Sequence, residues 1–190
     1  MPNQSPYQIV ISGIGGQGVL FITRLLAEAA IEKGLPVFTS ETHGMAQRGG
    51  TVISHLKIGN FSSPLIVPGS ADGLIALKAE SLVQHGGYLK PGGWAAVNSP
   101  APVNEVNQWH PRYLDADRLA ADMDNPRALN LIMLGFTLGN PWQINTAAGP
   151  LHCSLTDMAA VLEKRLQGKG PLLQASIQAL MAGGHRSSPA

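Results

Sequence analysis

Three glycines with the spacing G-x-G-x-x-G, Gly13, Gly15 and Gly18, lie near the start of the chain. They follow a short apolar segment that is typical of a strand and precede a segment with helical periodicity, which is the context of a dinucleotide-binding turn. Backbone amides at the beginning of such a helix can bind an anion. Glu41 follows Gly18 by 23 residues, roughly where a ribose-binding acid would stand. Taken alone, this spacing indicates a nucleotide site.

The same glycines also suit a purely structural role. Glycine permits a tight turn and a close approach of the helix to the sheet. Gly16 adds a further glycine, which makes the turn smaller than a pyrophosphate requires. We therefore favour the structural interpretation of the turn over nucleotide binding.

A second group of polar side chains extends from Glu41 to Gly50. It combines an acid, an imidazole, an amide and a guanidinium, and its three glycines indicate a demanding backbone or close approach by another molecule. The alternative is a solvated loop in which Arg48 pairs with Glu41. We favour a functional surface, either an interface or the rim of a ligand site. The candidate ligand or interface residues are Gly13, Gly15, Gly16, Gln17, Gly18, Glu41, Thr42, His43, Gly44, Met45, Gln47, Arg48, Gly49 and Gly50.

Asp72-Gly73 followed by Asn98 resembles the motif that holds a divalent ion in thiamine diphosphate enzymes. However, Ala71 stands where that motif has its first glycine, and both polar residues lie beside predicted strands, where turn residues are common. We therefore expect structural roles for Asp72 and Asn98. The six histidines show no metal-ligand spacing, and no G-x-S-x-G nucleophile motif occurs. The sequence predicts no metal site and no catalytic residue.

The composition excludes several classes of protein. Hydrophobic residues make up 44% of the 190 residues, which excludes a disordered chain. The formal net charge of +1 offers no field for binding nucleic acid or an acidic membrane. The single cysteine, Cys153, excludes a disulfide framework and an iron–sulfur cluster held by this chain alone. Charged residues reach only 13%, about half the usual ~25%, which indicates that part of the surface faces another protein.

The elements that must position the candidate residues alternate between strands and helices. Apolar or β-branched segments predict strands at 7–11, 36–41, 51–58, 73–77 and 94–98. Helical periodicity and a capping box between Ser154 and Asp157 predict helices at 19–33, 78–84, 126–139, 154–166 and 171–181. The first strand, the helix and the second strand should form a right-handed βαβ unit, so we expect parallel pairing at the core of the sheet. The fold class is α/β, a three-layer α/β/α arrangement with a mostly parallel, Rossmann-like sheet.

The chain, residues 1–190, is predicted to be one domain with a frayed tail at 183–190. The region 104–124 has no clear pattern. No secretory signal is visible, and the apolar runs are shorter than the roughly 20 residues that span a bilayer. We expect a cytoplasmic protein.

Two segments together resemble a known family. ISGIGGQGV at 11–19 and ETHGMAQRGG at 41–50 resemble the gamma domain of 2-oxoacid:ferredoxin oxidoreductases, most closely that of the indolepyruvate type. The segments 88–98 and 130–135 fit the same pattern. The resemblance covers most of the chain and is weakest at 104–124 and in the tail. The two N-terminal motifs are specific in combination, whereas the glycine spacing alone is not.

The resemblance implies an accessory subunit of an enzyme that oxidatively decarboxylates a 2-oxoacid to an acyl-coenzyme A and reduces ferredoxin. In this family thiamine diphosphate, magnesium and the iron–sulfur clusters belong to other domains or subunits. This chain is therefore expected to bind none of them alone and to be inactive in isolation. Its partners would be a large thiamine diphosphate and iron–sulfur subunit and, indirectly, ferredoxin. For the indolepyruvate type the substrates are arylpyruvates.

The same resemblance suggests roles for the candidate residues. The glycines would shape the turn, and Glu41, His43, Gln47 and Arg48 would form the contact surface, with Arg48 as a partner for phosphate or carboxylate. The chain would pack against the thiamine-binding part and share coenzyme A as a possible ligand. Two alternatives stay open: an independent NAD(P)-binding oxidoreductase, and a scaffold that touches no ligand.

Overall fold

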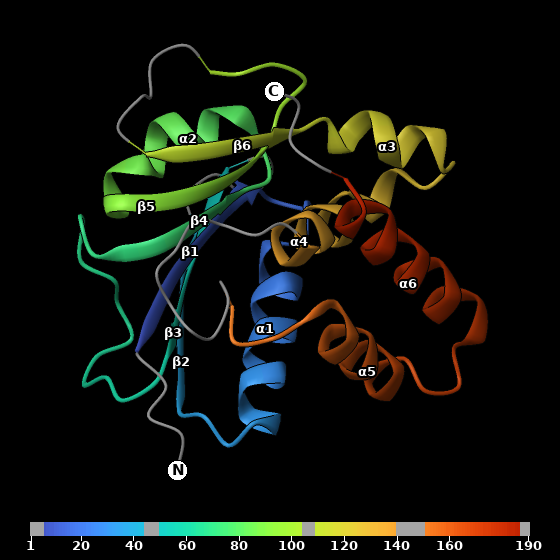
Figure 1. The fold of residues 1–190 in the computed structure, drawn as a ribbon, viewed down its shortest axis with the longest axis horizontal. Coiled ribbons are helices and arrows are strands. Elements are labelled where there is room, and N and C mark those ends of the chain that lie inside the picture. The colour runs from blue at the N-terminus through green and yellow to red at the C-terminus, as the bar shows by residue number, and fades with distance from the viewer. Residues whose placement is uncertain (1–5, 44–49, 104–108, 140–150, 187–190) are drawn as a thin grey trace.

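The computed structural model describes residues 6–43, 50–103, 109–139 and 151–186, which form a sheet with helices packed against it (Figure 1). The strands are β1 (Tyr7–Ile14), β2 (Val37–His43), β3 (Thr51–Ile58), β4 (Ala71–Ala76), β5 (Leu89–Asn98) and β6 (His110–Leu114). The helices are α1 (Val19–Glu32), α2 (Ala79–His85), α3 (Ala116–Asp122), α4 (Leu129–Gly139), α5 (Leu155–Arg165) and α6 (Gly170–Gly184). Two short 3₁₀ turns precede β5 and α4 (Gly86–Tyr88 and Pro126–Ala128). Every strand and helix predicted from the sequence is present, with bounds shifted by a few residues.

Two elements were not predicted, and both lie in the region 104–124. β6 is an edge strand of five residues that contains Pro111, and an edge strand tolerates a proline that would exclude a central one. α3 is a helix of seven residues. Its beginning is fixed by Asp115, whose side chain accepts a hydrogen bond from the Arg118 amide at 3.0 Å.

The last helix ends later than predicted. Gly183 and Gly184, which the sequence analysis assigned to the frayed tail, belong to α6. A Cβ atom on Gly183 would lie 1.9 Å from the carbonyl oxygen of Ile132 in α4, so this end of α6 packs closely on another helix. Tertiary packing therefore extends the helix through a pair of glycines that would end it in isolation. Residues 187–190 of the predicted tail lie outside the described residues.

The six strands form one sheet in the order β2-β3-β1-β4-β5-β6. β1, β4, β5 and β6 pair in parallel, whereas β3 pairs antiparallel with both β1 and β2. β1 and β2 of the predicted βαβ unit therefore run in the same direction but do not pair with each other, because β3 lies between them. Residues 53–58 of β3 are buried, which suits an interior position, whereas the exposed Phe38 and Thr39 of β2 suit an edge. The sheet as a whole is mixed and mostly parallel, as predicted.

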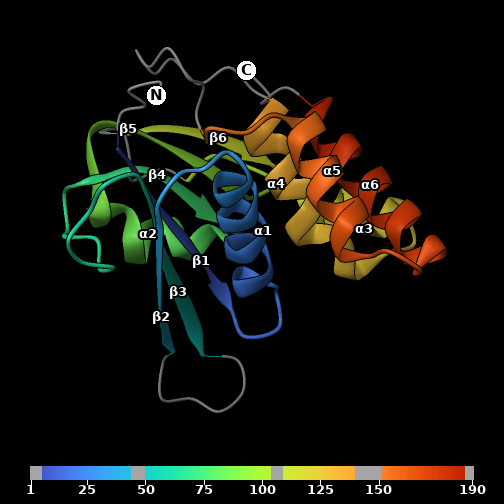
Figure 2. The same cartoon turned by 90° about the horizontal axis from the view of Figure 1, so that it is seen from below.

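Helices cover both faces of the sheet (Figure 2). α1 and the group α4, α5 and α6 lie on one face, and α2 lies on the other. The larger core lies between the sheet and the helices on the α1 side, and it contains Trp94, whose indole N–H donates to the Tyr7 hydroxyl at 2.6 Å. A smaller core around Leu82 and Leu89 lies on the α2 side. The three-layer α/β/α arrangement predicted from the sequence is confirmed.

Within the described ranges, the structure contains no helix with the length and apolar character needed to cross a membrane.

Candidate functional site

The glycine turn between β1 and α1 is closed by the side chain of Gln17, which belongs to the turn. The backbone amide of Ile14 donates to Oε1 of Gln17 at 2.9 Å, and Nε2 of Gln17 donates to the Leu77 carbonyl oxygen at 3.2 Å. Gly16 and Gly18 adopt φ values of 97° and 82°, a left-handed conformation that favours glycine. The Gln17 carboxamide thus bridges the ends of β1 and β4, at the edge where α/β folds usually bind ligands.

Gly18 is required by packing as well as by its backbone conformation. It is the N-cap of α1, and a Cβ atom there would lie 2.0 Å from Nδ2 of Asn130 in α4. The beginning of α4 therefore lies directly against the turn. This contact supports the structural interpretation of the glycine spacing.

The two sequence motifs meet at one place. The backbone amide of Gly15 donates to the carbonyl oxygen of Gly50 at 3.0 Å, which joins the turn to the end of the second motif. Glu41 and Thr42 are exposed near the end of β2, and His43 ends that strand opposite Val52. Gly44, Met45, Gln47, Arg48 and Gly49 lie outside the described residues, as does the side chain of His43. Their predicted contact role therefore stays a prediction.

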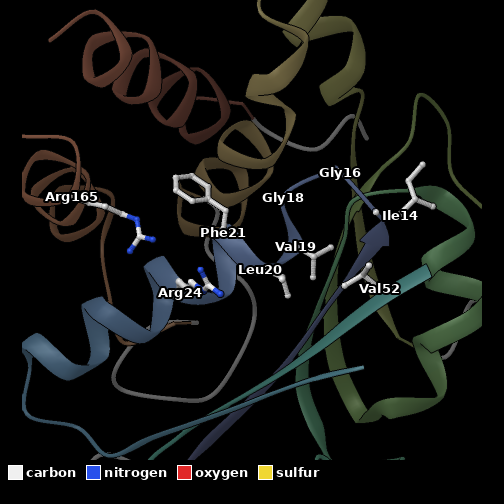
Figure 3. A pocket seen from close by; sticks show the side chains of 10 residues that line it. Ile14, Gly16, Gly18, Val19, Leu20, Phe21, Arg24, Val52 and Arg165 are labelled. Atoms are coloured by element: carbon white, nitrogen blue, oxygen red, sulfur yellow. The ribbon is translucent and has the colours of Figure 1, made fainter. Parts of the chain in front are cut away.

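A groove of about 440 Å³ opens beside the turn, along the N-terminal half of α1. Ile14, Val19, Leu20 and Val52 form its apolar part (Figure 3). Gly15, Gly16 and Gly18 of the turn also line it. Three of the predicted glycines thus border a cavity of a size that suits a bound molecule.

The other end of the groove carries positive charge. Arg24 of α1 and Arg165 of α5 lie there beside Phe21 (Figure 3). Arg165 pairs with Glu28, and its guanidinium carbon lies 5.8 Å from the centre of the Phe21 ring. Arg24 is exposed and makes no hydrogen bond or ion pair with any described residue. Together with the N-terminus of α1, these guanidinium groups favour an anion.

No pattern in the sequence singled out Arg24, Arg165 or Phe21 as groove residues. Arg24 follows Leu20 by one helical turn, so its place on the groove side of α1 could have been inferred from periodicity. Arg165 lies far away in the sequence, and only the packing of α5 on α1 brings it to the groove.

A serine–histidine pair lies under the turn. Oγ of Ser12 lies 2.9 Å from Nδ1 of His85, at the end of α2. Burial lowers the pKa of His85 below its usual value, so the imidazole is neutral at neutral pH. Because Ser12 is fully buried, no substrate reaches its hydroxyl. The pair fixes α2 to the end of β1 and is not a nucleophile with its base.

Asp72 and Asn98 lie at opposite ends of the sheet. Asp72, near the beginning of β4, pairs with Lys90 and accepts a hydrogen bond from the Gln8 amide at 2.7 Å. Asn98 ends β5, where it donates to the Leu77 carbonyl oxygen at 3.1 Å and accepts from the Ala116 amide at 2.9 Å. The structural roles predicted for both residues are confirmed.

The described side chains do not fit the cofactors of the family that the sequence resembles. No group of three or more His, Cys, Asp or Glu side chains that could hold a metal ion occurs in the described part of the chain. Burial raises the pKa of the Cys153 thiol to about 12, so this residue is a poor thiolate ligand. An iron–sulfur cluster, which needs several thiolates, therefore has no ligand set among the described residues.

Comparisons with known proteins agree with this geometry. A family model described as pyruvate ferredoxin/flavodoxin oxidoreductase matches residues 8–185. The indolepyruvate oxidoreductase subunit IorB of Archaeoglobus fulgidus is 34% identical over 151 residues, which cover 69% of this chain and 75% of that protein.

Two solved structures share the fold. The gamma subunit of a keto/oxoacid ferredoxin oxidoreductase from Geobacter sulfurreducens has a TM-score of 0.69 at 23% identity, over 94% of this chain and 96% of that one. The 2-oxoglutarate:ferredoxin oxidoreductase of Magnetococcus marinus, solved with 2-oxoglutarate, coenzyme A and succinyl-CoA bound, has a TM-score of 0.75 at 20% identity. The match covers 98% of this chain and 32% of that longer chain, so the present chain spans about a third of it.

The fold and the site define a Rossmann-like α/β domain whose glycine turn is closed by its own residues and borders a cationic groove. The chain belongs to the pyruvate ferredoxin/flavodoxin oxidoreductase family, as a domain of the gamma type. It is a subunit of a 2-oxoacid:ferredoxin oxidoreductase. The family predicted from residues 11–19 and 41–50 is confirmed.

Proposed function

We propose that this chain is the gamma-type accessory subunit of an indolepyruvate, or more broadly arylpyruvate, ferredoxin oxidoreductase of the cytoplasm. The 34% identity to an indolepyruvate oxidoreductase subunit supports this substrate class. A larger catalytic subunit would hold thiamine diphosphate, magnesium and iron–sulfur clusters, which supply decarboxylation and electron transfer to ferredoxin. This chain would provide binding surface.

The observation that carries the proposal is the hydrogen bond between Gly15 and Gly50. It brings the glycine turn and the segment that begins at Glu41 to the same edge of the sheet, although they are separate in the sequence. One continuous surface built from both motifs is what a subunit contact requires. An independent enzyme would instead need reactive side chains at this edge, and the hydroxyl of Ser12, which contacts His85, is buried there.

We further propose that the groove beside the turn contributes to the coenzyme A site of the assembled enzyme. Coenzyme A carries phosphates and an aromatic base, and the groove offers Arg24 and Arg165 at one end and an apolar wall at the other. The related Magnetococcus enzyme was solved with coenzyme A bound. Arg24 would hold a phosphate, because its guanidinium has no partner among the described residues.

Co-expression with the candidate large subunit tests the proposal. The two chains should co-purify, and the complex should reduce ferredoxin in the presence of coenzyme A and indolepyruvate or phenylpyruvate. The large subunit alone should lose most of this activity. Full arylpyruvate-dependent ferredoxin reduction without this chain, or failure to co-purify, would contradict the proposal. Preference for a branched-chain or dicarboxylic 2-oxoacid would correct the substrate class and leave the subunit role in place.

A further inference from the structure

β2 presents an open edge of the sheet. It is the outermost strand, paired with β3 on one side, and no other described strand pairs with it (Figure 2). Its seven residues keep an unbroken register with β3 from Val37 to His43. Phe38 is 39% exposed, and Thr39 is exposed beside it.

The register identifies which backbone groups point outward. The amide of Gly59 donates to the carbonyl oxygen of Pro36 at 2.8 Å, so these opposed residues form a hydrogen-bonded pair. In an antiparallel ladder such pairs alternate, so Phe38 and Ser40 bond to β3. The amides and carbonyls of the alternate residues, Val37 and Thr39 among them, therefore point away from β3.

This edge lacks the usual protection against pairing with another chain. Exposed edges are commonly blocked by a proline, a lysine, a bulge or a very short strand. β2 contains no proline or lysine and has no register shift, and its one carboxylate, Glu41, lies near its end, beyond Val37 and Thr39. The opposite edge strand, β6, is five residues long and contains Pro111. The sheet is thus blocked on one side and able to accept a strand on the other.

We propose that an extended segment of the catalytic subunit adds to β2 as a further strand of this sheet. The inference rests on the proposed function and specifies how the subunits meet. The last three residues of β2, Glu41 to His43, are the first residues of the predicted contact surface, so an added strand would continue that interface. Its main chain would pair with the outward groups of Val37 and Thr39.

A second copy of this chain is the weaker candidate for the same edge. Two β2 strands could pair over at most seven residues. The area that such a pairing buries is well below the roughly 800 Å² per partner that a stable dimer buries. A catalytic subunit that also contacts the glycine turn would bury further area beyond the strand pairing. The added strand then needs to supply only part of the interface.

Side chains on the α2 side of the sheet indicate which type of residue the added strand would place next to Phe38. Phe38 lies opposite Lys57, whose ammonium group lies 4.8 Å from the centre of the Phe61 ring. This apolar surface with one cation favours an apolar residue next to Phe38. Main-chain pairing would give affinity, and this position would give specificity.

Replacing Thr39 with proline tests the proposal in the co-expressed complex. Thr39→Pro removes an outward amide and leaves the hydrogen bonds to β3 in place, so the isolated chain should keep its circular dichroism spectrum and its melting temperature within a few degrees. Its affinity for the catalytic subunit should fall at least about tenfold, since the added strand loses a hydrogen bond and meets the proline ring. Thr39→Val is the matched control and should bind like the wild type.

Hydrogen exchange on the wild-type proteins gives a second measurement that does not depend on the variant. Peptides that contain Thr39 should exchange more slowly in the complex than in the isolated chain. Wild-type binding without such protection, or undiminished binding of a folded Thr39→Pro variant, would overturn the added strand and leave the proposed function intact. Absence of wild-type binding would overturn the proposed function itself. An isolated chain that is a dimer and becomes a monomer on Thr39→Pro substitution would show that a second copy occupies the edge, and would overturn the proposal.

Discussion

At the scale of single residues, Arg24 and Gln17 illustrate two uses of a polar side chain near the turn. Gln17 directs its carboxamide inward, where both of its ends bond to the backbone. It therefore stabilises the turn and offers little to a ligand. Arg24 lies further along α1, where it is exposed and makes no hydrogen bond or ion pair with a described residue. A charged group in this position has little effect on the free energy of folding while water solvates it. It would form charge-assisted hydrogen bonds with an anion bound in the groove.

Arg24→Ala in the assembled enzyme should raise the KM for coenzyme A about fivefold. The expected loss is about 1 kcal/mol, the lower range for a charge-assisted contact that stays partly exposed. The KM for the 2-oxoacid and kcat should not change, because no reacting group is removed. Steady-state kinetics with coenzyme A and the 2-oxoacid varied in turn provide the measurement. Lys164→Ala, which removes a nearby exposed cation that pairs with Glu32 outside the groove, is the control. An unchanged KM for coenzyme A would favour the pure scaffold.

At the scale of elements, α4 and α6 cross with their backbones in close contact. A Cβ atom on Gly135 would lie 1.9 Å from the Leu180 carbonyl oxygen, and one on Gly139 would lie 2.1 Å from the Gly184 carbonyl oxygen. Both obstacles are backbone atoms, which do not move aside as a flexible side chain would. Close contact of these backbones places Asn130, at the beginning of α4, against Gly18 of the turn. Helix packing and the shape of the site are thus connected through α4.

Gly135→Ala should lower the free energy of unfolding by about 2–3 kcal/mol, because the added methyl group separates two helix backbones. Chemical denaturation of the isolated chain provides the measurement. Gly170→Ala in the first turn of α6 is the matched control, since no atom lies within 4 Å of its added Cβ. It should change stability by less than about 0.5 kcal/mol. Equal effects of the two substitutions would contradict the close helix crossing.

At the scale of the whole molecule, strand order decides between nucleotide binding and an accessory role. In a dinucleotide-binding fold the acid that binds the ribose ends the strand next to β1. Here β3 lies between β1 and β2, so Glu41 is two strands away from the glycine turn, about 10 Å at the usual spacing of ~4.8 Å. The turn itself is closed by Gln17. These features disfavour the independent NAD(P)-binding oxidoreductase that the glycine spacing left open.

Calorimetric titration of the isolated chain with NAD or NADP should give no saturable heat up to millimolar concentrations. Glu41 lies too far from the turn to contact the ribose, and the Gln17 side chain closes the turn where the pyrophosphate would bind. Saturable binding in the micromolar range would restore the alternative. Chemical denaturation with and without the nucleotide gives a second measure, because a ligand that binds the folded state raises its stability.

The sequence by itself determined the local elements, the turn and the family. Apolar periodicity located β1 and α1, the capping box located α5, and the two N-terminal motifs identified the gamma-type domain. These features depend on residues that are close together in the sequence, so a local sequence pattern is enough to predict them. Tertiary structure alone decided the insertion of β3, the extension of α6 through Gly183 and the meeting of Arg24 with Arg165. Each of these depends on contacts between residues that are distant in the chain, where burial of whole strands and helices outweighs local preference.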